Sequence, residues 1–140
     1  MSRPLVIVEP KVHRRLKLID ALRDLHSLQP LPAIDGALRH IRVHRPAIVL
    51  IGVGWHAEPA LRLARQIRTD GSTPAMVGLM DWDGHLSRPS DSAQACGAVG
   101  VFSGPPSPAE LADFVAAFRP EEVVLRGTVQ TRGWTRFFKR

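Results

Sequence analysis

The chain has 140 residues, a length that fits one domain with its own hydrophobic core. Its single cysteine, Cys96, excludes an intramolecular disulfide framework, and no apolar run is long enough for a signal peptide or a membrane span, so we expect a cytoplasmic protein. The formal charge of +6 lies mostly in the tail, because five basic residues and no acidic one follow residue 125, which leaves +1 for the first 125 residues.

The first predicted unit is a strand followed by a helix. Residues 5–8 form a short apolar strand, and the helix after Pro10 repeats apolar residues on one stripe, at Val12, Leu16, Ile19 and Leu22. The second strand must lie within residues 27–33, where Pro30 and Pro32 interrupt the stretch. Because proline cannot donate to a sheet ladder, we expect this strand to be short and to lie at a sheet edge.

The next helix and the third strand flank Pro46. Asp35 is placed to cap that helix, and the proline stops it. Residues 48–51 then form an unbroken apolar run that suits a strand buried on both faces. The helix predicted over residues 58–69 places four apolar residues on one stripe, Ala60, Leu63, Ala64 and Ile67. Strand and helix together indicate a βα unit of a parallel sheet.

Two further strands complete the predicted sheet. Residues 75–80 form the fourth, and a polar loop leads from it to a short helix at residues 92–96. Residues 99–103 form the fifth, and the last helix begins at a capping box of Ser107 and Glu110. Five strands alternating with five helices predict an α/β fold, a flavodoxin-like five-stranded parallel sheet of order 2-1-3-4-5 with helices on both faces.

Five stretches carry a resemblance to a known family: VIVEP, HRPAIVLIGV, a helix containing QIR, TPAMVGLM, and CGAVGVFSGPPSPAEL. In this order they resemble the receiver domain of bacterial two-component response regulators, over roughly residues 4–118. The last stretch is the most telling, because it repeats the family's succession of glycine-alanine, strand, proline and capped helix. The resemblance implies a domain over residues 1–120 and a basic C-terminal tail or linker over residues 121–140.

The resemblance also implies a phosphorylation site whose residues are missing here. Receivers accept a phosphoryl group on an aspartate at the end of the third strand. They bind Mg²⁺ with an acidic pair after the first strand and use a lysine after the fifth strand. These positions fall on Gly52, on Glu9 with Pro10, and on Gly104. Phosphoryl transfer needs the nucleophile, the metal and the cation together. We therefore expect a pseudo-receiver with no enzymatic activity, no cofactor and no metal.

The family's two switch positions also carry other residue types here. The hydroxyl switch falls on Leu79 or Met80, depending on a loop whose length departs from the family. The aromatic switch falls on Val101, and Phe102 follows it on the opposite face of the strand. The resemblance therefore implies that the usual switch is absent.

Several polar residues near the predicted strand ends have two interpretations. Asp81 and Asp83, together with Glu9, offer carboxylates of the kind that hold a hard cation, but loop aspartates are commonly solvated turn formers. His56 and His85 lie on the same edge and could serve as an acid or base, yet no nucleophile stands at a fitting spacing. We expect ordinary loop histidines.

The remaining candidates are apolar or small. Gly52 and Gly54 form a GxG after a strand, but the third glycine of a nucleotide-binding fingerprint is absent. Trp55 and Trp82 either fill the vacated acidic pocket or stand exposed for a partner. Cys96 fits a small core residue better than a reactive thiol.

Together these features predict a protein-interaction module in bacterial signal transduction that works without phosphorylation. The resemblance places partner binding and homodimerisation in the region that begins at Ser92 and ends at Phe118. The alternative is a module for an anion or nucleic acid, in which the tail supplies the affinity through interleaved aromatic and basic residues, Arg132, Trp134, Arg136, Phe137, Phe138, Lys139 and Arg140. The other interpretation of the tail is a terminus whose aromatic residues fold back onto the domain.

Overall fold

The computed structural model describes residues 3–24, 26–71, 75–118, 130–131 and 134–136. Strands and helices alternate along the first part of the chain, as β1 (Arg3–Val8), α1 (Val12–Leu22), β2 (His26–Leu31), α2 (Ala37–His44), β3 (Ile48–Gly52), α3 (Glu58–Thr69), β4 (Met76–Asp81), α4 (Pro89–Cys96), β5 (Gly100–Ser103) and α5 (Pro108–Ala116). Two short strands follow, β6 (Gln130–Thr131) and β7 (Trp134–Arg136). No helix in these ranges is both long and apolar enough to cross a bilayer.

All strands belong to one sheet, in the order β2-β1-β3-β4-β5-β7-β6. The first five strands pair in parallel, so the predicted flavodoxin-like order 2-1-3-4-5 is confirmed. The last two strands were not predicted. β7 pairs antiparallel with β5, with Phe102 opposite Trp134, and β6 pairs antiparallel with β7.

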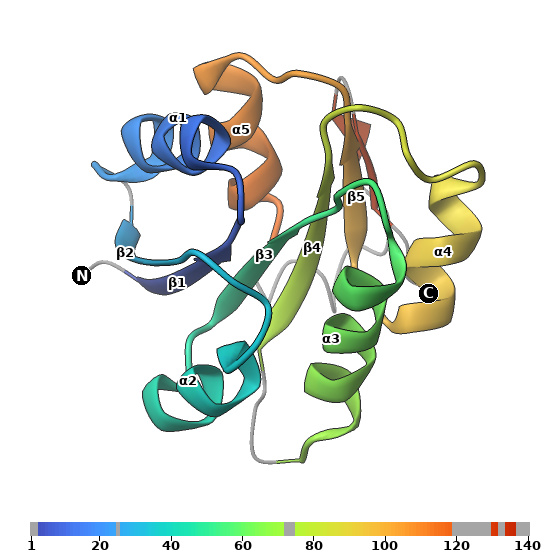
Figure 1. The fold of residues 1–140 in the computed structure, drawn as a ribbon. Helices are drawn as coiled ribbons and strands as arrows, with labels where there is room; N and C mark the ends of the chain where they lie inside the picture. The colour runs from blue at the N-terminus through green and yellow to red at the C-terminus, as the bar shows by residue number, and fades with distance from the viewer. Residues whose placement is uncertain (1–2, 25, 72–74, 119–129, 132–133, 137–140) are drawn as a thin grey trace.

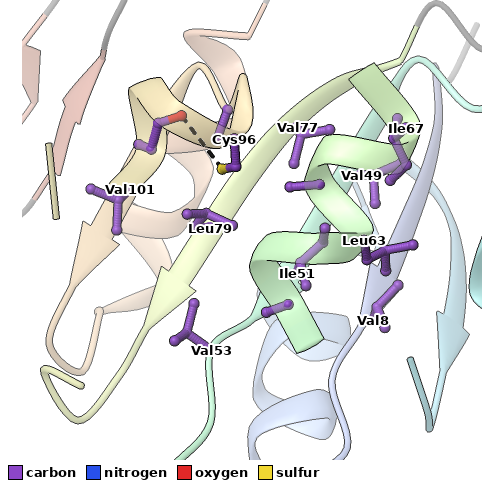
Figure 2. Close-up of a cluster of buried hydrophobic side chains, with 14 of the residues drawn as sticks. Val8, Val49, Ile51, Val53, Leu63, Ile67, Val77, Leu79, Cys96 and Val101 are labelled. Carbon is purple, nitrogen blue, oxygen red and sulfur yellow. Dashed lines mark hydrogen bonds between the residues drawn. The ribbon is translucent and has the colours of Figure 1, made fainter. Parts of the chain in front are cut away.

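The sheet separates two apolar cores (Figure 1). One core lies under α1 and α5 and takes alternate residues of the central strands, such as Leu5, Ile7 and Leu50. The other lies under α2, α3 and α4 and takes the intervening residues, such as Val8 and Ile51 (Figure 2). Because both faces are covered, β3 is buried along its whole length, as its unbroken apolar run predicts.

The predicted apolar stripe of α1 is wrong in its first half, at Val12 and Leu16, whereas Leu22 is buried and Ile19 packs against the core as predicted. Val12 and Leu16 are more than half exposed, whereas Arg14, Leu18 and Leu22 are the buried residues of this helix. The periodicity misled because Arg14 counts as polar in the sequence, although its side chain lies against the domain and is only 10% exposed.

The second strand and the start of α2 also differ from prediction. β2 lies at the sheet edge as expected, but it is six residues long, as long as β1, and it contains Pro30. An edge strand needs ladder bonds on one side only, so the proline is tolerated. Asp35 does not cap α2: the N-cap is Gly36, with φ 81°, and it makes no side-chain capping bond.

The later helices agree with the sequence more closely. The stripe of α3 is buried as predicted, at Ala60, Leu63, Ala64 and Ile67. α4 begins at Pro89, earlier than expected. The capping box of α5 is confirmed, because Ser107 Oγ accepts from the Glu110 N–H and the Glu110 carboxylate accepts from the Ser107 N–H. Cys96 is a buried core residue whose Sγ donates to the Ala93 carbonyl, and burial raises the pKa of its thiol.

Candidate functional site

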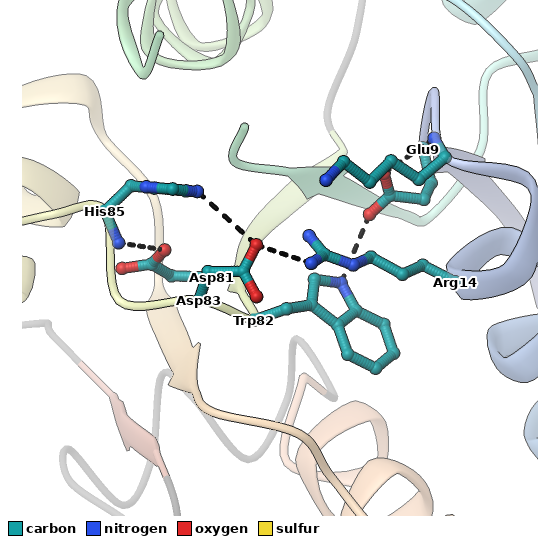
Figure 3. Close-up of polar contacts among 7 residues, drawn as sticks. Glu9, Arg14, Asp81, Trp82, Asp83 and His85 are labelled. Carbon is teal, nitrogen blue, oxygen red and sulfur yellow. Dashed lines mark hydrogen bonds and ion pairs between the residues drawn. The ribbon is translucent and has the colours of Figure 1, made fainter. Parts of the chain in front are cut away.

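The candidate site lies where β1, β3 and β4 end at the same edge of the sheet. Val8 pairs with Ile51, so Glu9 and Gly52 follow as neighbours one residue further along their strands. Gly52 also pairs with Met80 on the other side. The loop after β4 brings Trp82 back to Glu9 (Figure 3). The site is therefore built from the residues that directly follow three central strands.

Glu9 occupies the space that any side chain at Gly52 would need. A Cβ placed on Gly52 would lie 2.1 Å from Glu9 Oε1 and 2.6 Å from Glu9 Cδ, both far inside van der Waals contact. The two positions are therefore coupled: a glycine at the end of β3 leaves room for a carboxylate that enters from β1.

The Glu9 carboxylate is buried and held in place by two donors. Its residue is only 3% exposed. The Lys11 backbone N–H donates to Oε2 and Trp82 Nε1 donates to Oε1, each at 3.1 Å. Burial raises the pKa of Glu9, and the Lys11 N–H, the positive charge of Arg14 and the indole N–H oppose that rise only in part.

Arg14 joins α1 to the loop after β4. Its Nη2 lies 2.5 Å from Asp83 Oδ2, and its guanidinium carbon lies 5.7 Å from the centroid of the Trp82 ring. The hydrogen bond from Arg14 holds the pKa of Asp83 below its usual range. His85 Nε2 lies 3.4 Å from the same carboxylate. Arg14, Trp82 and Asp83 thus close the α1 side of the site (Figure 3).

Asp81 shapes the loop after β4. It is the last residue of β4, is fully buried, and accepts hydrogen bonds from the backbone N–H groups of His85 at 2.8 Å and Leu86 at 3.0 Å. It is a turn former, as the sequence suggested, but a buried one. Glu9, Asp81 and Asp83 each have their own protein donors, and the described residues contain no group of three side chains suited to a metal ion.

The two tryptophans have opposite roles. Trp82 fills the site, with only 7% of its surface exposed, as the pocket-filling interpretation predicts. Trp55, in the loop after β3, is 80% exposed, and its ring meets the His85 ring edge-on with ring centroids 5.8 Å apart. His56 is also exposed on this loop. The outer rim of the site therefore presents a bare indole.

No family model matches this sequence, and no curated protein matches it. Solved structures do match. The chemotaxis response regulator CheY4 of Vibrio cholerae has a TM-score of 0.75 at 13% identity, covering 85% of this chain and 100% of that one. A putative response regulator from Chloroflexus aurantiacus J-10-fl has a TM-score of 0.75 at 19% identity, covering 84% and 98%. The DrrB receiver domain from Thermotoga maritima has a TM-score of 0.72 at 16% identity, covering 84% and 97%. This chain has the receiver fold.

The remaining receiver positions can now be placed in the structure. Gly104 follows β5 with φ +91°, a left-handed conformation that a lysine would adopt only with strain, and its N–H donates to the Asp81 carbonyl. Pro10 is exposed beside Glu9. Met80, the residue in register with Gly52, faces the α1 and α5 core, whereas Leu79 faces the other core.

The fifth strand of this receiver fold agrees with the prediction that its switch residue and its neighbour face opposite ways. Val101 packs in the core under α2, α3 and α4, and Phe102 packs in the core under α1 and α5. In the tail, Trp134 and Arg136 belong to β7, while Arg132, Phe137, Phe138, Lys139 and Arg140 lie outside the described residues. Tail-based binding of an anion or nucleic acid therefore stays a prediction.

Sequence reasoning missed one residue of the site, Arg14. It bonds to Asp83, which lies 69 positions away in the chain, and no local pattern marks that contact. In the sequence, the buried face of α1 would show Arg14 as a polar residue among apolar ones, but the predicted face of this helix did not include position 14.

The buried charge at Glu9 makes a prediction about pH. Burial raises the folded-state pKa of Glu9, so the unfolded state loses this proton at a lower pH than the folded state does. The Glu9 carboxylate therefore destabilises the fold as pH rises above the usual glutamate pKa of about 4.3. Glu9→Gln stays neutral but can accept only one of the two hydrogen bonds, so we expect its melting temperature to rise relative to that of wild type as pH increases from about 4 to about 7. Thermal melts across this range measure it.

Asp83→Asn is the matched control, and its effect has the opposite sign. The folded-state pKa of Asp83 is lowered, so its contribution to stability is present above the usual aspartate pKa and is lost as pH falls through the folded-state value. The variant should melt below wild type at pH 7. A melting-temperature difference between Glu9→Gln and wild type that stays constant across this pH range would show that the Glu9 charge does not destabilise the fold.

Proposed function

We propose that this protein is a pseudo-receiver, a module of signal transduction that binds protein partners without aspartyl phosphorylation. The observation that carries the proposal is the contact of Glu9 with Gly52. The end of β3 bears no nucleophile, and the carboxylate of Glu9 fills the space where one would project. Loss of the nucleophile is thus accompanied by placement of the Glu9 carboxylate in the vacated space.

The other requirements of phosphoryl transfer are weakened as well. Mg²⁺ takes oxygen ligands, and of the acidic pair only Glu9 remains, already bonded to Lys11 N–H and Trp82. The cation that neutralises the transferred phosphoryl group is missing at Gly104. Arg14 brings a positive charge to the site, but Asp83 is bound to it. These contacts favour a site fixed in one arrangement.

Partner binding is proposed for the region of α4, β5 and α5, in which the two helices lie on opposite faces of the sheet and β7 covers the outer edge of β5. α4 and α5 expose polar and small residues there, such as Gln94 and Asp113. β7 is hydrogen-bonded along β5, so a second copy could not add a strand to that edge while β7 is in place. A homodimer through this region would therefore use side chains of the helices rather than backbone pairing. The exposed Trp55 offers a separate apolar contact at the site's rim.

The test is phosphorylation of the intact chain by acetyl phosphate with Mg²⁺, read by intact-protein mass spectrometry. An ordinary receiver treated in parallel is the positive control. We expect no mass increase of one phosphoryl group in this protein, because no carboxylate stands at the end of β3. A phosphorylated species whose phosphoryl group maps to a single residue would overturn the proposal.

The same preparations also test the interaction. Proteins captured from the cytosol of the native host by the immobilised chain should be the same with and without acetyl phosphate. Capture that appears only under phosphorylating conditions contradicts phosphorylation independence. Capture of nothing under either condition contradicts the role as an interaction module.

A further inference from the structure

A second charged surface lies away from the site, on α2 and α3. These helices run side by side on the face of the sheet opposite α1 and α5 (Figure 1). Between them they carry six exposed arginines, Arg39, Arg42, Arg45, Arg62, Arg65 and Arg68. We call this set the arginine face.

The arginine face holds the entire positive excess of the domain. Residues 35–70 contain six arginines and three acidic residues, a formal charge of +3. The rest of residues 1–118 contains seven lysines and arginines and eight acidic residues, a formal charge of −1. The average over the first 125 residues therefore hides a strong separation of charge.

Most of these charges are available to a ligand. Arg42 on α2 pairs with Asp70, the C-cap of α3, at 2.5 Å. Arg65 pairs with Glu58, the first residue of α3. In the part of the chain that the structure describes, Arg39 and Arg62 form no ion pair and no side-chain hydrogen bond. The same holds for Arg45 and Arg68. Four guanidinium groups thus have their donors unused, and of these Arg68 lies on the side of α3 that faces α4, where its stem approaches Gly97.

A hollow of about 250 Å³ runs between the two helices. Leu38 and Leu63 form part of its apolar wall, and Arg62 stands at its side. The other five arginines do not line this hollow, so it is a depression beside Arg62 and not a groove that the whole set flanks. Asp35 is the one acidic side chain that lines the hollow.

The composition of the face selects the class of partner. Among the exposed large apolar residues of the described chain, only Val43 lies on α2 or α3. Helices that lie on membranes need an apolar face to insert, and the centre of a protein interface is usually its most apolar part, so both fit this face less well than a polyanion does. Single-stranded nucleic acid is bound by stacking on aromatic side chains, and α2 and α3 contain no phenylalanine, tyrosine or tryptophan. What fits is a regular polyanion recognised by charge alone.

We propose that the arginine face binds the phosphate backbone of a nucleic-acid duplex, without reading bases. Phosphate contacts position a protein on a duplex and carry no sequence information directly. Such binding is independent of the site at Gly52, so the proposal stands or falls separately from the loss of phosphorylation.

The experiment measures fluorescence anisotropy of a short labelled DNA duplex with the full chain. With about four phosphate contacts, affinity is expected to fall about 100-fold between about 50 and about 200 mM salt. Arg39→Glu/Arg62→Glu is expected to lower affinity at least about tenfold at low salt. The charge-preserving variant Arg39→Lys/Arg62→Lys is expected to bind within about threefold of wild type, because phosphate contacts need charge more than geometry.

The matched control is Arg23→Glu/Arg88→Glu, which makes the same change in net charge on other parts of the surface. Both residues are exposed and sit in weak i,i+3 ion pairs, so this control should fold and bind nearly as wild type does. Equal loss in both double variants, or no duplex binding by wild type at low salt, would overturn the proposal. So would tight binding to phosphatidylglycerol vesicles with no binding to the duplex.

Discussion

Gly52→Asp is expected to lower the free energy of unfolding by roughly 2–5 kcal/mol and to leave the protein unable to accept a phosphoryl group. The new Cβ would overlap Glu9 Oε1, which now lies 2.1 Å from that point. Glu9 would have to leave its bonds to Lys11 N–H and Trp82 Nε1 while a second carboxylate enters the same buried space. Urea unfolding at pH 7 measures the loss.

A double-mutant cycle identifies the cause. Glu9→Ala removes the obstructing carboxylate, so Gly52→Asp/Glu9→Ala is expected to recover much of the loss, with a coupling energy of about 1–3 kcal/mol. Gly52→Ala adds a Cβ without a charge, so it measures the steric part of the stability loss. If the two positions behave additively, Glu9 does not occupy the space beyond Gly52, and the main support for the pseudo-receiver is lost.

The fold was predictable because its signals are local. The apolar run of β3, the stripe of α3 and the Ser107 capping box each depend on residues close together in the chain, and each is confirmed. Parallel order then follows from the alternation of strands and helices. The register of β2 and the buried face of α1 depend on distant partners, and there the prediction was incomplete or wrong.

The site was predictable only as separate positions. The sequence predicted Gly52 as a departure from the family pattern and Glu9 as the one carboxylate kept from the acidic pair, but nothing in it shows that Glu9 fills the space at Gly52. In the same way, Trp82 follows Asp81 in a polar stretch, and only the fold turns it inward to Glu9. Side-chain direction after a strand end depends on tertiary packing, which local composition does not encode.

Charge was misjudged for a different reason. A near-neutral total over the first 125 residues suggested that basic character belongs to the tail. Arg39 and Arg42 belong to α2 and Arg62 to α3, and they come to the same part of the surface only because these two helices pack together. The tail itself contributes strands β6 and β7, which favours a terminus that folds back onto the domain.

Phe114→Ala is expected to lower the free energy of unfolding by about 3–5 kcal/mol. Phe114 is fully buried and packs edge-on against Phe102 on β5, at 5.5 Å between ring centroids, and against Phe118 at 4.8 Å. Its ring therefore joins α5 to the sheet, and its removal leaves a cavity that the rigid strands cannot close. A typical domain has a free energy of unfolding of about 5–15 kcal/mol, so the variant should be close to unfolding at physiological temperature.

Val12→Ala is the control, because Val12 is more than half exposed and its truncation should change stability by about 0.5 kcal/mol or less. Hydrogen exchange then separates two ways of losing Phe114. If α5 alone loosens, its amides exchange faster while those of β1 and β3 keep their protection. The proposed partner surface of α4, β5 and α5 would then lose partner binding without global unfolding. If all strands lose protection together, α5 belongs to the single cooperative core, and this surface can change only when the whole domain opens. A loss below about 1 kcal/mol in Phe114→Ala would contradict both, since α5 would then not be anchored through this ring.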